Sequence, residues 1–234
     1  MSNVSYDFAF RKFWNNTIPK IVIKLKRWFS GLINIKGLPW ANAIASANPL
    51  IWLGDLVFLT LDMIMIPEIY ELIKTLILKN RLRQLNEEEE KIAEMVFGDN
   101  LDISSILINT RMVKGMEKLC TAYVSFNCIN FTSCIRDKIL VHELVHVYQY
   151  QRHGSLYLFR AILAQLRKDT YDYGGLHRLS QLMTLGKGIF MYNFEQQAEI
   201  IEDYYFYSFE NQELGAYGLS VYRYFYQDFL ENNG

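Results

Sequence analysis

The sequence has little cysteine, proline and histidine, and no excess of charge of either sign. Its 234 residues include three cysteines, four prolines and four histidines, and 24 basic residues nearly balance 25 acidic ones. A nucleic-acid-binding domain needs a basic surface, so a formal net charge of −1 argues against a nucleic-acid partner. Hydrophobic residues make up 51% of the chain, which is enough to bury a core and argues against intrinsic disorder.

The three cysteines do not match a disulfide or zinc framework. Cys120, Cys128 and Cys134 are an odd set without a CxxC pair. We expect them to be buried thiols, with metal ligation as the alternative. Reduced thiols are typical of a cytoplasmic protein.

We do not expect residues 1–14 to be a secretory signal peptide. Residues 1–14 include Asp7, Arg11 and Lys12 and so contain no uninterrupted apolar core of the required length. We expect a protein that is cytoplasmic as synthesised and that would be exported, if at all, by a non-classical route.

No long hydrophobic run occurs even in the most apolar segment, residues 49–78. A helix that spans a bilayer needs about 20 apolar residues, and this segment is interrupted too often to provide them. We predict one or two buried or interfacial helices, broken at the proline. Packing against the rest of the chain is one interpretation; peripheral contact with a membrane or a partner through residues 49–78 is the alternative, and a transmembrane helix is disfavoured. The interrupting residues are Asp55, Asp62, Pro67, Glu68 and Glu71.

Composition divides the chain into two predicted regions. Residues 1–82 form an apolar, helical N-terminal extension, and residues 83–234 form the main domain. The main domain begins with a predicted helix at residues 87–97. Asn86 is its expected N-cap, and Gly98 is expected to end it.

Strand-like segments are confined to residues 103–110 and 122–131, which are rich in β-branched and aromatic residues. A helix is expected to follow, capped by Thr132 or Ser133 and ended by Gly154. We therefore predict an α+β domain that is mainly helical, with a small sheet beside this last helix.

An HExxH motif lies in that helix, which reads ILVHELVHVYQYQRHG from Ile139 to Gly154. Residues four apart share one face of a helix, so His142 and His146 are placed to bind one metal ion. Glu143 is rotated by about 100° and can act as a general base on a metal-activated water. The alternative is a core helix with two incidentally paired histidines.

A third ligand is expected from the helix predicted after Asn193. Asn193 and Gln196 are typical of a capping box. Glu195 and Glu199 then lie four apart on one face, where one carboxylate can bind zinc and the other can hydrogen-bond a ligating histidine. The alternative is that both are solvated glutamates.

Three residues between the two metal-binding segments are candidates for contact with the substrate or with a developing oxyanion. They are Tyr171, Tyr173 and His177. Their position in the sequence is the only reason for choosing them, and His177 is also an isolated candidate ligand.

The downstream ExxxE pair resembles the gluzincin arrangement, which implies that Glu195 binds zinc and Glu199 supports a histidine. The reverse assignment stays open. More closely, residues 83–205 resemble a bacterial family of predicted zincin peptidases, a domain of unknown function of which some members occur beside toxin-delivery systems. The resemblance rests on LNEEEEKIAEMVFGDNLDISSILI, HELVHVYQYQ and YNFEQQAEIIEDYY. It implies a zincin-like metallopeptidase fold.

The expected function is zinc-dependent hydrolysis, most directly of peptide bonds, with one Zn²⁺ and with Glu143 as general base. The strand expected at residues 122–131 would align an extended protein or peptide substrate. Two alternatives remain: a non-catalytic zincin-fold binding module, and an interaction protein at a membrane surface.

Overall fold

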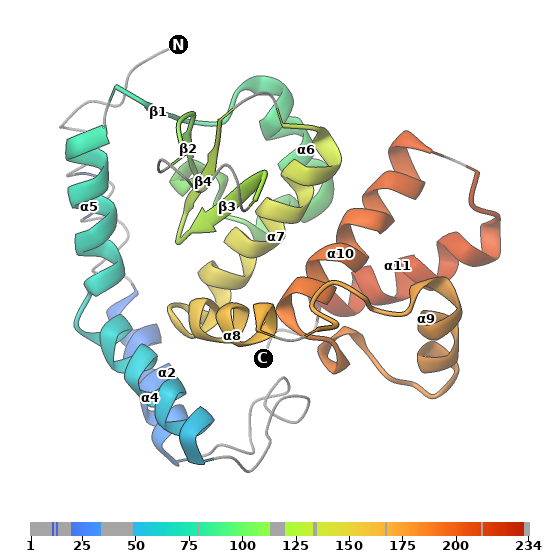
Figure 1. Cartoon of the computed structure of the whole chain (residues 1–234), viewed down its shortest axis with the longest axis horizontal. Helices are drawn as coiled ribbons and strands as arrows, with labels where there is room; N and C mark the ends of the chain where they lie inside the picture. The colour runs from blue at the N-terminus through green and yellow to red at the C-terminus, as the bar shows by residue number, and fades with distance from the viewer. Residues whose placement is uncertain are drawn as a thin grey trace.

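The computed structural model describes residues 11, 13, 20–33, 49–78, 80–112, 120–132, 135–166, 168–211 and 213–231. Cys134 and the cap candidate Ser133 lie outside these residues, as does most of the chain before residue 20. The described part places helices around one small sheet (Figure 1). This confirms the predicted α+β, mainly helical class.

The elements follow one another in the order given by their numbers. The described α-helices are α2 (Ile21–Ile33), α4 (Pro49–Met63), α5 (Ile66–Leu78), α6 (Glu87–Phe97), α7 (Asp137–His153), α8 (Leu156–Gln165), α9 (Gly175–Thr184), α10 (Phe194–Tyr205) and α11 (Ala216–Glu231). Shorter helical segments are η1 (Gly98–Asn100), η2 (Ile103–Ser105), η4 (Ile189–Met191) and η5 (Phe206–Glu210). The strands are β1 (Leu82–Arg83), β2 (Leu107–Asn109), β3 (Ala122–Ser125) and β4 (Cys128–Phe131).

The four strands form one mixed sheet in the order β1-β2-β4-β3. The pair β2 and β4 is parallel, whereas β1 with β2 and β3 with β4 are antiparallel. Strand β3 is therefore an edge of this sheet, and it lies against helix α7. The predicted division of the chain at residue 82 coincides with strand β1, which pairs with β2.

The expected single strand at residues 122–131 is wrong, because the chain turns at Phe126 and Asn127. Phe126 adopts a left-handed backbone conformation with φ 59°, which non-glycine residues rarely do. Its ring packs against Tyr70 and Tyr150 at centroid distances of 5.3 and 5.2 Å. The backbone N–H of Asn127 donates to Glu71 at 2.7 Å. These tertiary contacts stabilise a turn that the local sequence does not signal.

Three helix ends follow the local sequence, at Asn86, Gly98 and Gly154, whereas the start of α7 departs from it. Asn86 caps α6 as predicted, in a capping box with Glu89. Gly98 and Gly154 end α6 and α7, both at positive φ. Thr132 does not cap α7, because that helix begins five residues later, at Asp137, which places a carboxylate in the first turn where the helix dipole favours it.

Helix α7 runs through the centre of the core. Every side chain from Leu140 to Tyr150 is buried, including the polar ones. Helix α10 makes the most extensive contact with it, and α6, α8 and β3 also pack on it (Figure 1). The HExxH motif therefore lies where several elements meet, rather than on an open surface.

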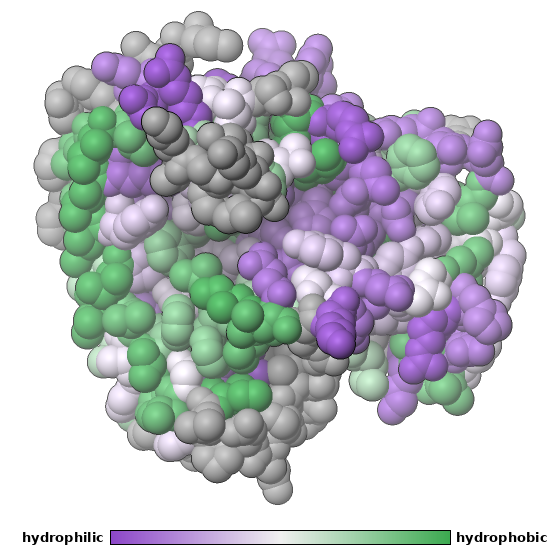
Figure 2. Space-filling view, viewed as in Figure 1, coloured by the Kyte–Doolittle hydropathy of each residue, from purple (hydrophilic) through white to green (hydrophobic). Residues whose placement is uncertain are grey.

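The N-terminal helices pack along one side of this core. Helix α4 ends at Met63 and α5 begins at Ile66, so the predicted break falls just before Pro67. Helix α4 contacts α2, α5 and α8. Among the described helices, none is long and apolar enough to cross a membrane. The outer side of α5 and α4 is rich in hydrophobic residues (Figure 2).

Candidate metal centre

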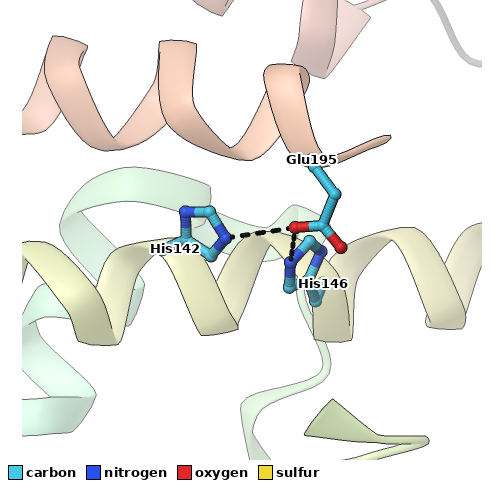
Figure 3. A group of neighbouring side chains, drawn as sticks. All are labelled: His142, His146 and Glu195. Atoms are coloured by element: carbon cyan, nitrogen blue, oxygen red, sulfur yellow. Dashed lines mark hydrogen bonds and ion pairs between the residues drawn. The ribbon is translucent and has the colours of Figure 1, made fainter. Parts of the chain in front are cut away.

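Two helices bring together the three predicted ligands. His142 and His146 project from one face of α7, and Glu195 reaches between their rings from the first turn of α10 (Figure 3). Glu195 Oε2 lies 3.6 Å from His142 Nε2 and 3.1 Å from His146 Nε2. All three residues are buried, and their donor atoms lie within 4.8 Å of one another. Such a group can hold a metal ion.

The Nδ1 atom of each histidine is engaged by another side chain. His142 Nδ1 lies 2.8 Å from Glu202 Oε2, and His146 Nδ1 lies 3.0 Å from Gln149 Oε1. Both partners are acceptors, so each Nδ1 carries the proton in the neutral ring. Each Nε2 then presents its lone pair toward Glu195, which is the tautomer that metal ligation through Nε2 requires.

Sequence reasoning missed Glu202. The hydrogen bond to a ligating histidine was expected from Glu199, but Glu199 Oε1 lies 3.7 Å from His142 Nδ1, beyond hydrogen-bond distance. Glu202 makes that bond instead. Glu202 is seven residues after Glu195, so all three glutamates share one face of α10, and this spacing was the signal available in the sequence.

Glu195 is held by a residue that the sequence did not single out. Gln165 Nε2 donates to Glu195 Oε1 at 3.1 Å, which leaves Oε2 directed at the histidines. Burial raises the pKa of Glu195, but the adjacent His146 and His142 outweigh burial and hold that pKa well below its ordinary value. Glu195 is therefore an anion over the whole neutral range.

The two imidazoles have raised pKa values in the metal-free protein. Burial lowers the pKa of His142, but the carboxylates of Glu195 and Glu202 outweigh burial and raise it to about 10. The pKa of His146 is also raised, because Glu195 outweighs burial there. Protonated histidines thus balance the negative charge of the buried carboxylates. A metal cation bound at the same positions would balance the same charge.

Glu143 is buried beside this group, and its Oε2 has no hydrogen-bond partner among the described residues. Burial raises its pKa, while His146 and His142 act in the opposite direction. A buried oxygen without a partner is costly and calls for an explanation such as a catalytic role, a water or an ion. Two imidazoles, one carboxylate and this nearby orphan oxygen fit the donor chemistry of a zinc site.

A cavity of about 470 Å³ opens onto these residues. Edge strand β3 forms part of its wall through Tyr123 and Val124. Helix α8 contributes apolar side chains, including Leu158 and Ile162. The cavity therefore combines a strand edge, an apolar wall and the cluster of buried ionisable groups.

Of the three residues chosen for their sequence position, the structure brings one to the cavity. Tyr171 lines it, with its ring 6.3 Å from that of His142, and burial followed by nearby Glu195 raises its pKa to about 12. Tyr173 is not in the wall, and its hydroxyl bonds to Asp203 and Tyr222.

His177 lies exposed on α9, away from the cavity, and its Nε2 contacts Gln181 at 2.9 Å. Sequence reasoning missed Tyr157, a buried wall residue whose ring lies 5.5 Å from that of His146.

Comparison with known proteins gives one partial likeness. No protein-family model matches the chain, and no solved structure matches it. The chain is similar to the type VI secretion system spike protein VgrG2b of Pseudomonas aeruginosa, with 30% identity over 154 residues. The match covers 57% of this chain and 13% of the spike protein, so the chain spans about an eighth of that protein's length.

Proposed function

We propose that the chain is a zinc-dependent metallohydrolase with a zincin-like fold, and that it cleaves peptide bonds. The main support is the convergence of His142 Nε2, His146 Nε2 and one Glu195 oxygen at a cavity that Glu143 also lines. Two imidazoles and one carboxylate are a typical protein ligand set of hydrolytic zinc sites.

Each residue of the centre has a separate role in this proposal. His142, His146 and Glu195 would hold the ion, while Glu202, Gln149 and Gln165 fix the orientation of these three ligands. Zinc would supply a Lewis acid that lowers the pKa of water toward about 7 and polarises a carbonyl.

Glu143 acts as the general base in this proposal. Its unpartnered carboxylate oxygen takes the proton from the attacking water and then delivers it to the leaving amine. Tyr171 would donate a hydrogen bond to an oxyanion in this proposal, since it lines the cavity and a pKa of about 12 keeps its hydroxyl protonated.

The edge of the sheet supports a peptide as the substrate. Strand β3 has a neighbour, β4, on one side only among the described strands, and it lines the cavity. An extended peptide can pair with such an edge through its main chain and so place a carbonyl beside Glu143.

The similarity to a spike protein supports one further part of the proposal, a link between this chain and a type VI secretion system. The match covers only a small part of that protein, so it adds support for the biological setting rather than for the chemistry.

The decisive experiment separates metal binding from catalysis. Purified protein should contain about one zinc per chain and cleave members of a peptide library. His146→Ala should lose zinc, whereas Glu143→Gln should keep zinc and lose cleavage, because ligand and base are different residues. Full activity in Glu143→Gln would contradict the assigned role of Glu143.

The same experiment tests the alternative of a non-catalytic module. Stoichiometric zinc in the wild-type protein, with no cleavage of any peptide, would favour a zincin-fold binding protein. Absence of zinc after supply of the metal would contradict the metallohydrolase and leave a binding module that works without metal.

A further inference from the structure

The first three described helices expose almost only apolar side chains. Of the 21 large hydrophobic residues that are exposed in the described part of the chain, 13 lie between residues 21 and 77. We call these 13 residues the N-terminal apolar face. They are Ile21, Val22, Ile23, Leu25, Phe29, Leu53, Val57, Ile64, Ile66, Ile69, Tyr70, Ile73 and Ile77.

Helix α5 shows the arrangement most clearly. Its exposed residues follow the spacing i, i+3, i+4, i+7 and i+11 from Ile66 to Ile77, which places them on one stripe of the helix. The buried residues Pro67, Glu68 and Thr75 lie on the side that faces the protein. The helix is thus amphipathic with its apolar stripe directed outward, along the side of the molecule seen in Figure 2.

The carboxylates of α4 and α5 do not interrupt this face, because each of them is bonded inward. Asp55 pairs with Arg160, Asp62 with Ser155, Glu68 with Lys24, and Glu71 accepts from Asn127. The four acids that interrupt the apolar segment in the sequence are therefore absent from its exposed side.

The charge that remains outside is positive. Among the side chains described in α2, α4 and α5, the exposed charged one is Lys26, and none of the exposed ones is acidic. Lys20, just before α2, is half-buried. An apolar helix face with lysine beside it complements the chains and headgroups of an anionic bilayer surface.

The residue types also favour a lipid over a protein partner. Protein interfaces are enriched in aromatic residues, Met and Arg at their centre. Here two aromatic residues, Phe29 and Tyr70, accompany eleven aliphatic ones. We propose that the N-terminal apolar face binds the surface of a bilayer that contains anionic lipid, with α5 lying in the interface.

The test is co-sedimentation of the full chain with vesicles. Vesicles of phosphatidylcholine and phosphatidylglycerol in equal parts should carry the protein down, and phosphatidylcholine alone should carry less. The triple variant Ile69→Ser, Ile73→Ser, Ile77→Ser should bind at least about tenfold more weakly, because it removes three apolar side chains from the exposed stripe that would enter the bilayer surface. Lys26→Glu should weaken binding to the anionic vesicles alone.

A matched control removes the same number of exposed apolar residues elsewhere. The variant Met95→Ser, Leu185→Ser, Met191→Ser should keep vesicle binding, since these residues lie outside the face. Zinc content and thermal unfolding of each variant show that it is folded.

Three results would overturn the proposal. The first is that the wild-type chain does not bind anionic vesicles. The second is that the α5 triple variant binds them as tightly as the wild type, and the third is that the control variant loses as much binding as the α5 triple variant. Self-association of the wild-type chain that the α5 variant abolishes, without vesicle binding, would assign the face to a second copy of the chain.

Discussion

At the scale of single residues, the candidate metal centre depends on which carboxylate supports His142. Glu202 lies within hydrogen-bond distance of its Nδ1, and Lys138 Nζ lies 3.3 Å from the other oxygen of Glu202. Glu199 is further from the ring and more exposed. The geometry therefore indicates that Glu202, rather than Glu199, fixes the orientation of the His142 ring.

We expect Glu202→Ala to weaken zinc binding by roughly 10–100-fold, the usual effect of losing a partner of a ligating histidine. Glu199→Ala should weaken binding less than Glu202→Ala, because it breaks no hydrogen bond to the ring. Competition with a chromophoric chelator measures both affinities. A larger loss in Glu199→Ala would restore the role expected from the sequence.

Local sequence was sufficient to predict which three candidate ligands lie together, but not which side chains hydrogen-bond to them. The HExxH spacing and the capping box around Asn193 are local features, and the structure places His142, His146 and Glu195 together. The choice between Glu199 and Glu202 depends on how α10 packs against α7, which no local pattern encodes. Gln165 was missed for the same reason, since its contact with Glu195 depends on the position of α8.

At the scale of elements, helix ends with a side-chain cap were predictable and the tertiary turn was not. Asn86 and Asn193 both accept from the backbone N–H groups of their helices, as the sequence indicated. The turn at Phe126 depends on tertiary contacts with residues of α5 and α7. Because the residues on both sides of it have strand-like composition, the sequence alone predicted one continuous strand.

The two asparagine caps provide a matched pair for testing the role of α10. Replacing either by alanine should cost about 1 kcal/mol of the free energy of unfolding, because a helix loses a capping hydrogen bond. Asn193→Ala should also weaken zinc binding, since Glu195 lies in the turn that this cap fixes. Asn86→Ala should leave zinc binding unchanged, because α6 holds none of the three ligands.

Urea denaturation and zinc titration of both variants provide the measurement. Equal zinc affinity in the two would show that the first turn of α10 keeps its position without the cap.

At the scale of the whole molecule, the buried charges predict how stability depends on pH. The folded pKa of His142, about 10, lies above its ordinary value of 6.5. Its contribution to stability is therefore complete below pH 6.5 and is lost as the pH rises toward 10. Glu195 has a lowered pKa, so its contribution is present above about 4.5 and is lost in acid.

We therefore expect the chelator-treated protein to lose stability between about pH 6.5 and 10. Zinc should reverse this trend, because binding displaces protons from the histidines and so strengthens with rising pH. Denaturant unfolding with and without chelator, at several pH values, measures both. In chelator, the free energy of unfolding of the His142→Asn variant should depend less on pH than that of the wild type. An unchanged pH dependence would contradict the assignment of this effect to His142.

The separation of the ligands along the chain has one more consequence. His146 and Glu195 are 49 residues apart along the chain. A metal ion bound to both residues would close that loop as a covalent cross-link does. By the loop-entropy relation used for disulfides, such a link lowers the entropy of the unfolded chain by an amount equivalent to roughly 4 kcal/mol. The centre would then act as a reversible cross-link. The free energy of unfolding of the protein would therefore depend on the concentration of available metal.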